Sequence, residues 1–251
     1  MSTGLNRTLM ILRSHTDSRS DTRPDVSSQP PVVGAYRRLR AVAGDIKRTA
    51  PGVVSMMPRI ARVGVQRLLG RSDYARWSNP KSLETWWDSR TQKLARFIPP
   101  RSRVVEFGAG RRQLPHYLPQ GCTYFASDLT KRSPETIICD LNRRPLPDLR
   151  HLNADVAVFA GVLEYVRDLP SVARWLSGQT RSIIASYDNV KSQPTTVARV
   201  VELCRRSYFG YHNNSRLEEL TAVFSSAGFR CVQTDEWESQ HIIVFRLVAA
   251  D

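Results

Sequence analysis

The eight residues from Arg103 to Gly110, with the sequence RVVEFGAG, constrain the fold of this chain more than any other stretch. The β-branched and aromatic residues of Val104–Phe107 predict a short buried strand. Gly108 and Gly110 follow it, and glycine allows the backbone to turn sharply and to approach a ligand closely. Glu106 brings a carboxylate near the carboxyl end of the strand, where open α/β sheets bind ligands. We therefore expect a strand, a glycine loop and then a helix whose N-terminus faces a ligand.

The spacing of the glycines distinguishes this stretch from the dinucleotide-binding fingerprint. That fingerprint needs a third glycine at position 113, where this chain has Gln113. The pattern is Glu-x-Gly-x-Gly, and two glycines after an apolar run also suit a simple strand-to-helix turn. The residues that follow the later strands decide between the two interpretations.

Segments typical of strands alternate with segments typical of helices from Arg103 onward. The expected parallel strands are Val104–Phe107, Thr123–Ser127, Thr136–Cys139, Asp155–Phe159 and Ser182–Ser186. Helices are expected around 174–176, over 195–206 and over 217–227, and a final antiparallel pair over 230–233 and 242–247. This order predicts the α/β class, with a Rossmann-like, mostly parallel seven-stranded sheet and helices on both faces.

The residues before the first expected strand have a different composition. Residues 1–100 contain 18 Lys and Arg against 7 Asp and Glu, so they carry +11 of the net charge of +14. Residues 1–34 are rich in Ser, Thr, Asp, Arg and Pro without a period, which predicts a disordered basic tail. We expect a helical N-terminal extension over 35–100 and the sheet domain over 101–251.

Three helical patterns follow one another in the extension, over 36–49, 53–69 and 80–100. The middle pattern has an apolar face, and Arg59, Arg62 and Arg67 lie elsewhere on the helix. Such a basic amphipathic helix can dock on its own domain or lie on an anionic membrane surface. The positive charge also suits nucleic acid, and a solvated tail without a partner is a further alternative.

Cysteine and histidine usage gives no sign of a metal site or of a disulfide framework. The five histidines are scattered, and no cysteines stand at metal-ligand spacing: Cys122, Cys139, Cys204 and Cys231. We expect reduced thiols in a cytoplasmic protein, because no stretch resembles a signal peptide or spans a membrane. Peripheral attachment to a membrane is the alternative.

Small or acidic residues follow four of the expected strands. Asp128 ends the second strand, 22 residues after Glu106; Asp140 ends the third strand, and Gly161 follows the fourth. An ionised carboxylate at the second position can accept hydrogen bonds from both hydroxyls of a ribose. Asp140 can accept from the exocyclic amine of an adenine. Because the carboxyl ends of parallel strands meet at one edge, these residues predict a nucleoside-binding site.

The motifs VVEFGAG, YFASDL, CDLN and DVAVFAGVLEYVRD together resemble the successive motifs of class I S-adenosylmethionine-dependent methyltransferases. The resemblance covers about Trp86–Val248 and implies S-adenosylmethionine as the cofactor. It implies Glu106, Gly108, Ala109 and Gly110 on the methionine side, Asp128 and Leu129 at the ribose, Asp140 and Leu141 at the adenine, and Gly161 at the reactive end.

Methyl transfer depends mainly on holding the acceptor in line with the methyl group, and a general base is needed only for a protonated acceptor. The candidates for catalytic residues are Glu164, Tyr165, Tyr187 and His212. Tyr165 stands where a histidine is common in small-molecule and lipid-directed members of the family. The resemblance therefore does not imply a histidine-based proton relay.

The segment 188–215 is aromatic and basic, and in similar proteins an insertion at this place shapes the acceptor pocket. We expect a small-molecule, sugar or lipid-linked acceptor that is methylated at oxygen. An RNA-directed methyltransferase that uses the basic N-terminal arm is an alternative. A non-catalytic scaffold with a methyltransferase fold is a second alternative.

Overall fold

The structure is a computed structural model that describes residues 56–66, 69, 72–190, 193 and 195–248. The expected disordered tail over 1–34 and the expected helix over 36–49 lie outside the described residues. Residues 56–66 are helical. None of the helices in the described ranges is long and apolar enough to cross a membrane.

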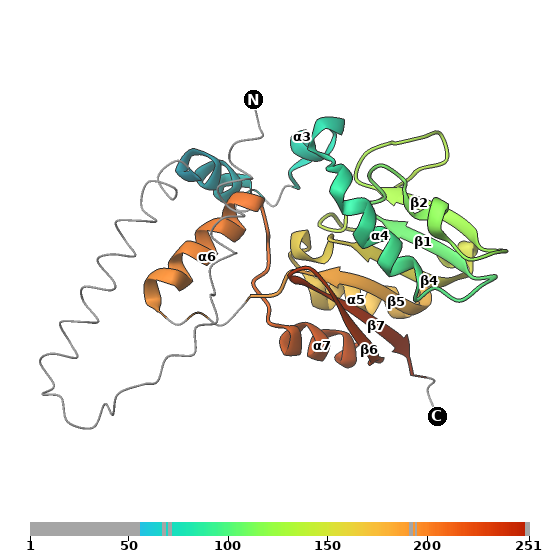
Figure 1. Cartoon of the computed structure of the whole chain (residues 1–251). Helices are drawn as coiled ribbons and strands as arrows, with labels where there is room; N and C mark the ends of the chain where they lie inside the picture. The colour runs from blue at the N-terminus through green and yellow to red at the C-terminus, as the bar shows by residue number, and fades with distance from the viewer. Residues whose placement is uncertain (1–55, 67–68, 70–71, 191–192, 194, 249–251) are drawn as a thin grey trace, which may run out of the picture. The chain divides into compact units, whose positions relative to one another are not determined.

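A single seven-stranded sheet forms the centre of the described chain, in the order β3-β2-β1-β4-β5-β7-β6 (Figure 1). Strands β1 to β5 pair in parallel, and β7 runs antiparallel to both β5 and β6. The strands are β1 Arg103–Phe107, β2 Thr123–Asp128, β3 Ile137–Ile138, β4 Ala154–Ala160, β5 Thr180–Tyr187, β6 Phe229–Trp237 and β7 Gln240–Leu247. The expected fold class and the antiparallel last pair are confirmed.

Alternation along the strands divides the core between the two faces of the sheet. In β1, Val105 and Phe107 pack into one core cluster, whereas Val104 packs into the other. Successive side chains of a strand point to opposite faces, so each buried strand contributes to both clusters. Glu106 has the same parity as Val104 and therefore belongs to that second face.

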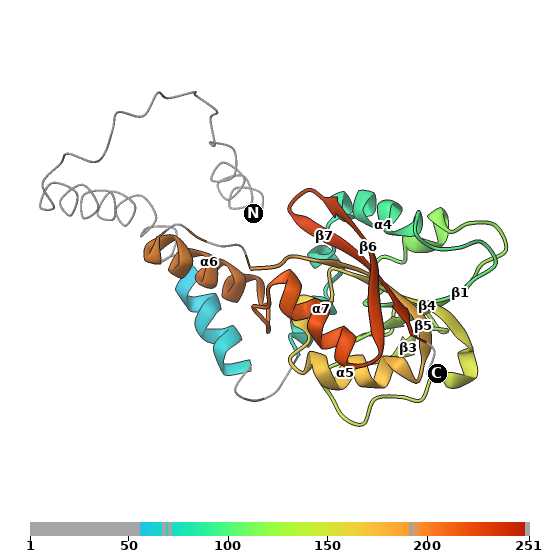
Figure 2. The ribbon, with the colours of Figure 1, turned by 90° about the horizontal axis from the view of Figure 1, so that it is seen from below.

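Helices cover both faces of the sheet, as expected. Helix α4 (Asp88–Ala95) packs on one face through Leu94. Helices α5 (Leu169–Ser177) and α7 (Leu217–Ser226) pack side by side on the other face. Figures 1 and 2 show this arrangement, with α4 on one side of the strands and α5 and α7 on the opposite side.

The expected helix directly after the glycine loop is wrong. The chain instead forms a single 3₁₀ turn over Leu114–Tyr117. Gly110 and Arg112 both have positive φ, of 50° and 55°, which interrupts a right-handed helix before it can begin. Pro119 follows closely and limits any extension, because the residue before a proline disfavours the helical region. The loop therefore cannot use a helix N-terminus to bind a ligand.

Two further expectations need correction. The pattern over 80–100 is not one helix: 3₁₀ turns over Pro80–Ser82 and Thr85–Trp87 precede α4, because Leu83 and Glu84 are extended between them. The third strand is shorter than expected and excludes Thr136. That hydroxyl accepts hydrogen bonds from the backbone N–H groups of the preceding turn, at 2.8 and 3.2 Å, so the residue belongs to the turn.

Helix α6 (Thr196–Phe209) follows β5 and differs from the other long helices in its burial. Arg206 is its only fully buried side chain among the described residues. The helix over 56–66 contacts α6 through Arg59, whose Nε–H donates to the carbonyl of Tyr208 at 2.7 Å. Short helix α3 (Tyr74–Trp77) contacts the same end of α6, because Arg76 donates to the carbonyl of Phe209.

Candidate functional site

The glycine loop after β1 is held against the end of β2 by its own backbone. Gly108 has a φ of 66°, which suits glycine and disfavours other residues. The N–H of Ala109 donates to the carbonyl of Ser127 at 3.0 Å, and the N–H of Gly110 donates to Oδ2 of Asp128 at 2.8 Å. The structure thus brings Gly108, Gly110 and Asp128 together, as the sequence predicted.

The carboxylate of Asp128 is buried and has several partners within the protein. Besides Gly110, it accepts from the N–H of Thr130 at 2.9 Å and lies 3.3 Å from both the Thr130 hydroxyl and Arg132 Nη2. A carboxylate offers about four acceptor positions. Three of these contacts are made to Oδ1, so Oδ2, which accepts only from Gly110, has a position left for a ligand hydroxyl. Leu129 lies between Asp128 and Thr130, at the same end of β2.

Glu106 lies at the end of β1, almost completely buried. The hydroxyl of Tyr124 donates to its Oε2 at 2.6 Å. Burial raises the pKa of Glu106 to about 8, although the hydrogen bond from Tyr124 acts in the opposite direction. Burial penalises the charged form of an acid, and here this effect exceeds that of the hydrogen bond. At neutral pH this carboxyl group is therefore mostly protonated, ready to ionise beside a cation.

Asp140 and Leu141 follow β3 at the same edge of the sheet. Oδ1 of Asp140 accepts from the Ser72 hydroxyl at 2.7 Å and from the N–H of Asn142 at 2.9 Å. The Asn142 amide in turn donates to Ser72 Oγ at 3.1 Å and to the carbonyl of Tyr165 at 2.8 Å. Leu141 is buried in the core. Ser72, which the sequence did not single out, thereby ties the N-terminal extension to this edge.

A buried arginine from α4 covers Gly161, the residue that follows β4. Gly161 has a φ of 67°, and a Cβ there would lie 2.4 Å from Nη1 of Arg90. Nη2 of Arg90 donates to the carbonyl of Ala160 at 2.9 Å, whereas its buried Nε–H has no hydrogen-bond partner among the described residues. The rings of Trp87 and Trp237 lie 5.5 Å from the guanidinium carbon. Burial lowers the pKa of this arginine.

Glu164 is almost completely buried. Its Oε1 accepts from the N–H of Asp188 at 2.7 Å, and within the described residues its buried Oε2 has no partner. Burial raises the pKa of Glu164 to about 7, against the effect of the Asp188 N–H. The N–H of His212 donates to the carbonyl of Glu164 at 2.7 Å. The structure therefore brings Glu164 and His212 together.

The two tyrosines proposed as catalytic occupy different places. Tyr165 makes edge-to-face contacts with Trp77 and Tyr211, with ring centroids 5.0 and 5.3 Å apart. Burial raises its pKa to about 12. Tyr187 is part of the hydrophobic core, and its hydroxyl contacts Asn213 Oδ1 and the Ser215 carbonyl. Its contacts give Tyr187 a structural role that links β5 to the loop after α6.

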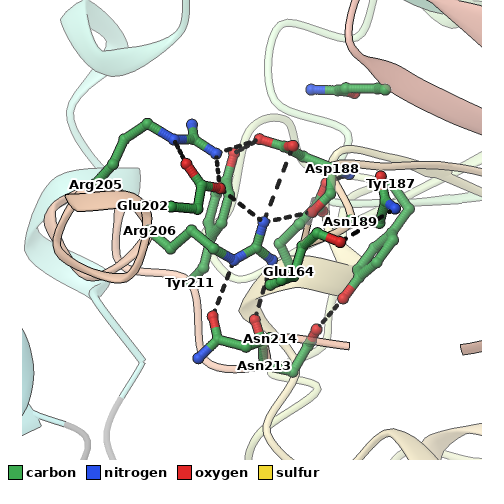
Figure 3. A network of polar contacts seen from close by, with 12 residues as sticks. Glu164, Tyr187, Asp188, Asn189, Glu202, Arg205, Arg206, Tyr211, Asn213 and Asn214 are labelled. Carbon is green, nitrogen blue, oxygen red and sulfur yellow. Dashed lines mark hydrogen bonds and ion pairs between the residues drawn. The ribbon is translucent and has the colours of Figure 1, made fainter. Parts of the chain in front are cut away.

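A polar network fixes the C-terminal end of α6 to the end of β5 (Figure 3). The buried guanidinium of Arg206 donates to the carbonyl of Asp188 at 2.7 Å, to Asn214 Oδ1 at 2.9 Å and to the carbonyl of Asn213 at 3.2 Å. Arg205 pairs with the Asp188 carboxylate at 3.2 Å. These contacts place the aromatic segment after α6 beside Glu164.

Sequence reasoning missed Arg90, and it included Asn213 in the acceptor segment without predicting its contacts. The amide of Asn213 donates to the carbonyls of Leu163 and Val166, at 2.6 and 3.1 Å, and nothing in the sequence signals this. Arg90 does leave a signal, because it lies four residues before Leu94 on the buried face of α4. A charged residue on an apolar helix face indicates a specific partner. In the described part of the chain, no three His, Cys, Asp or Glu side chains gather as metal ligands would.

Comparisons with known proteins establish the fold. No protein-family model matches the chain, and a search of curated proteins finds no match. Solved structures do match. Mitomycin 7-O-methyltransferase MmcR has a TM-score of 0.52 at 16% sequence identity, over 67% of this chain and 56% of that one. This chain thus spans little more than half the length of that protein.

Two further solved structures cover more of both chains. CalO1, a methyltransferase in calicheamicin biosynthesis solved in its SAH-bound form, has a TM-score of 0.53 at 15% identity, over 81% of this chain and 71% of that one. Human N-acetylserotonin methyltransferase in complex with SAM has a TM-score of 0.53 at 15% identity, over 82% and 70%. The chain has the fold of class I methyltransferases, as its motifs predicted.

Proposed function

We propose that this protein is an S-adenosylmethionine-dependent methyltransferase that acts on a small-molecule acceptor, at an oxygen atom. The observation that carries the proposal is the carboxyl edge of the sheet, where Glu106, Asp128, Asp140 and Gly161 gather beside a positive-φ glycine loop. The solved structures with the same fold support it, because their names describe methyltransferases, two of them bound to SAH or SAM.

The residues at this edge fit the parts of the cofactor one by one. Asp128 would accept from one ribose hydroxyl at Oδ2 and from the other at Oδ1 in exchange for a 3.3 Å contact. Asp140 and Leu141 would lie on the adenine side. Glu106 would ionise beside the ammonium group of the methionine part, since an adjacent cation favours the charged form of an acid. When bound, S-adenosylmethionine supplies an electrophilic methyl group.

We propose that Arg90 is a further cofactor-binding residue, which binds the carboxylate of the methionine part. Its guanidinium lies directly over Gly161, and its buried Nε–H lacks a partner among the described residues. A buried and incompletely paired cation is unfavourable, and a bound carboxylate would relieve that cost. The planar fork of arginine also matches a carboxylate with two parallel hydrogen bonds.

Glu164 is the best placed of the catalytic candidates to take a proton from a hydroxyl acceptor. Its free Oε2 is buried, and a pKa of about 7 allows it to accept a proton at neutral pH. Tyr165 and His212 flank it, so we propose that they position the acceptor. Tyr187 is not proposed for this role because its hydroxyl already contacts Asn213 and Ser215.

Calorimetric titration of two related ligands tests the cofactor assignment. S-Adenosylhomocysteine has the amino acid carboxylate, and methylthioadenosine shares the nucleoside but lacks that group. We expect Arg90→Met to weaken binding of S-adenosylhomocysteine about tenfold or more, as the loss of a charged hydrogen bond would. Binding of methylthioadenosine should change little.

Arg96→Met is the matched control for this titration, because Arg96 follows the same helix and is exposed. It should change the affinity for neither ligand. Equal losses for both ligands in Arg90→Met would indicate a general disturbance and contradict the carboxylate role. If the wild-type protein bound neither ligand, the methyltransferase proposal itself would fail.

A further inference from the structure

A cavity of about 330 Å³ lies between the helix over 56–66 and α3, outside the cofactor edge. Arg59, Arg62 and Val63 line it from the first helix, and Asp73 and Arg76 line it from the other side. Three of these five side chains are guanidinium groups. The cavity is large enough for a small polyatomic ion or for the polar head of a larger molecule.

The charges around the cavity are not balanced by the protein. Asp73 is the only carboxylate among the lining residues, and its Oδ1 accepts from the Gln66 amide at 3.3 Å. Among the described residues, no carboxylate forms an ion pair with Arg59, Arg62 or Arg76. Burial lowers the pKa of Arg59, and the positive charge of Arg76 lowers it further. An anion in the cavity would relieve this repulsion.

Two of the arginines have a structural role that uses only part of their hydrogen-bonding capacity. Arg59 donates through Nε to the Tyr208 carbonyl at 2.7 Å, and Arg76 donates through Nη1 to the Phe209 carbonyl at 2.5 Å. Both therefore cap the C-terminal end of α6. Each guanidinium has five N–H groups, so several remain for a ligand. Capping does not explain Arg62, which has no such contact within the described residues.

The cavity lies next to the candidate acceptor side, which is the region around Glu164, Tyr165 and His212. The Arg76 guanidinium stacks on the ring of Trp77 at 4.3 Å, and Trp77 contacts Tyr165 at 5.0 Å. One aromatic layer therefore separates the cavity from the turn that carries Glu164. A molecule held by an anionic group in the cavity could reach this turn past that layer.

We infer that this cavity binds a phosphate group and, if the proposed function is right, that the phosphate belongs to the acceptor. Arginine forks match phosphate oxygens with paired, charge-assisted hydrogen bonds. The phosphate has two chemically equivalent sources, a soluble phosphorylated metabolite or a phospholipid headgroup. Met57 and Val65 make the lipid source testable, because they are 51% and 54% exposed on the helix over 56–66.

Titration of the full chain with inorganic pyrophosphate tests the cavity directly. Arg62→Gln is the informative variant because it leaves both caps of α6 intact. We expect it to weaken binding about tenfold, the effect of losing a charge-assisted hydrogen bond. Arg199→Gln is the matched control, since Arg199 is an exposed arginine on α6 and does not line the cavity. It should leave the affinity unchanged.

Co-sedimentation with vesicles identifies the source of the phosphate. Binding to phosphatidylglycerol but not to phosphatidylcholine vesicles, lost in both Arg62→Gln and Val65→Glu, would support the site and assign it to a lipid headgroup. Pyrophosphate binding without vesicle binding would support the site and assign it to a soluble ligand.

The inference would be overturned if neither pyrophosphate nor anionic vesicles bound, or if Arg62→Gln and Arg199→Gln reduced binding equally. Titration of the same samples with S-adenosylhomocysteine keeps the two proposals separate. Cofactor binding without phosphate binding would remove this inference alone. Phosphate binding without cofactor binding would remove the proposed function and leave an anion site.

Discussion

At the scale of single residues, Glu106 keeps a proton that an exposed glutamate would lose. Burial raises its pKa to about 8 from an ordinary value of 4.5. Between these pH values the side chain is protonated in the folded protein and ionised in the unfolded chain. The unfolded chain then binds fewer protons, so the free energy of unfolding decreases as the pH rises through this range.

We therefore expect urea denaturation to show lower stability at pH 8 than at pH 5, with Glu106→Gln reducing the slope. Glu164 acts in the same direction up to its pKa of about 7, so the variant should keep part of the slope. Glu218→Gln, at an exposed position of α7, should keep the wild-type slope. An unchanged slope in Glu106→Gln would show that this carboxyl is ionised in the folded protein.

The residues of the candidate site could be predicted where their position follows from strand order alone. Glu106 and Asp128 lie at the carboxyl ends of parallel strands, and Asp140 follows the next parallel strand, so the strand order brings them to one edge. Arg90 could not be predicted in the same way, because its place over Gly161 depends on how α4 packs against the sheet. The contact between Asp140 and Ser72 spans 68 residues and likewise has no local signal.

At the scale of elements, one buried side chain joins α6 both to the end of β5 and to the loop after the helix. Removing Arg206 would leave the carbonyls of Asp188 and Asn213 and the amide of Asn214 without their donor. Unpaired buried polar groups are costly, so we expect Arg206→Met to destabilise the docking of α6 by about 3 kcal/mol. Hydrogen exchange should then show faster exchange of the α6 amides with little change in β1.

Arg199→Met on the same helix provides the comparison, since an exposed substitution usually changes stability by less than about 0.5 kcal/mol. Exchange that rose equally in both variants would indicate that α6 opens independently of the network around Arg206.

The sheet could be predicted from the sequence better than the short elements around it. Strands β1, β4 and β5 are buried over most of their length and rich in β-branched and aromatic residues, which is typical of parallel strands covered by helices. The helix expected after the glycine loop depended on the backbone of Arg112, and a positive φ at an arginine cannot be anticipated from its side chain. Leu83 and Glu84 divide another expected helix because their backbone is extended, which their side chains likewise do not reveal.

At the scale of the whole molecule, part of the excess positive charge of residues 1–100 can be assigned to a specific place. The arginines of the cavity belong to the basic residues 1–100, whereas residues 101–251 carry only +3. Part of the positive charge that predicted an anionic partner thus lines the cavity next to the candidate acceptor side. The tail over 1–34 lies outside the described residues, so its disorder and its partner stay predictions.

The measurement that tests the central claim most directly is the thermal shift of the full chain with S-adenosylhomocysteine. A ligand at 100 times its dissociation constant stabilises a protein by about 2.7 kcal/mol, or roughly 5–10 °C at this size. We expect this shift in the wild-type protein and in Asp148→Ala, an exposed control outside the site.

Each variant should be compared with its own ligand-free midpoint, because Asp128 also holds Gly110, Thr130 and Arg132 in place. The proposed pocket predicts that Asp128→Ala loses the shift while Asp148→Ala keeps it. A folded wild-type protein with no shift, or a shift that survives in Asp128→Ala, would contradict a cofactor site at this edge of the sheet.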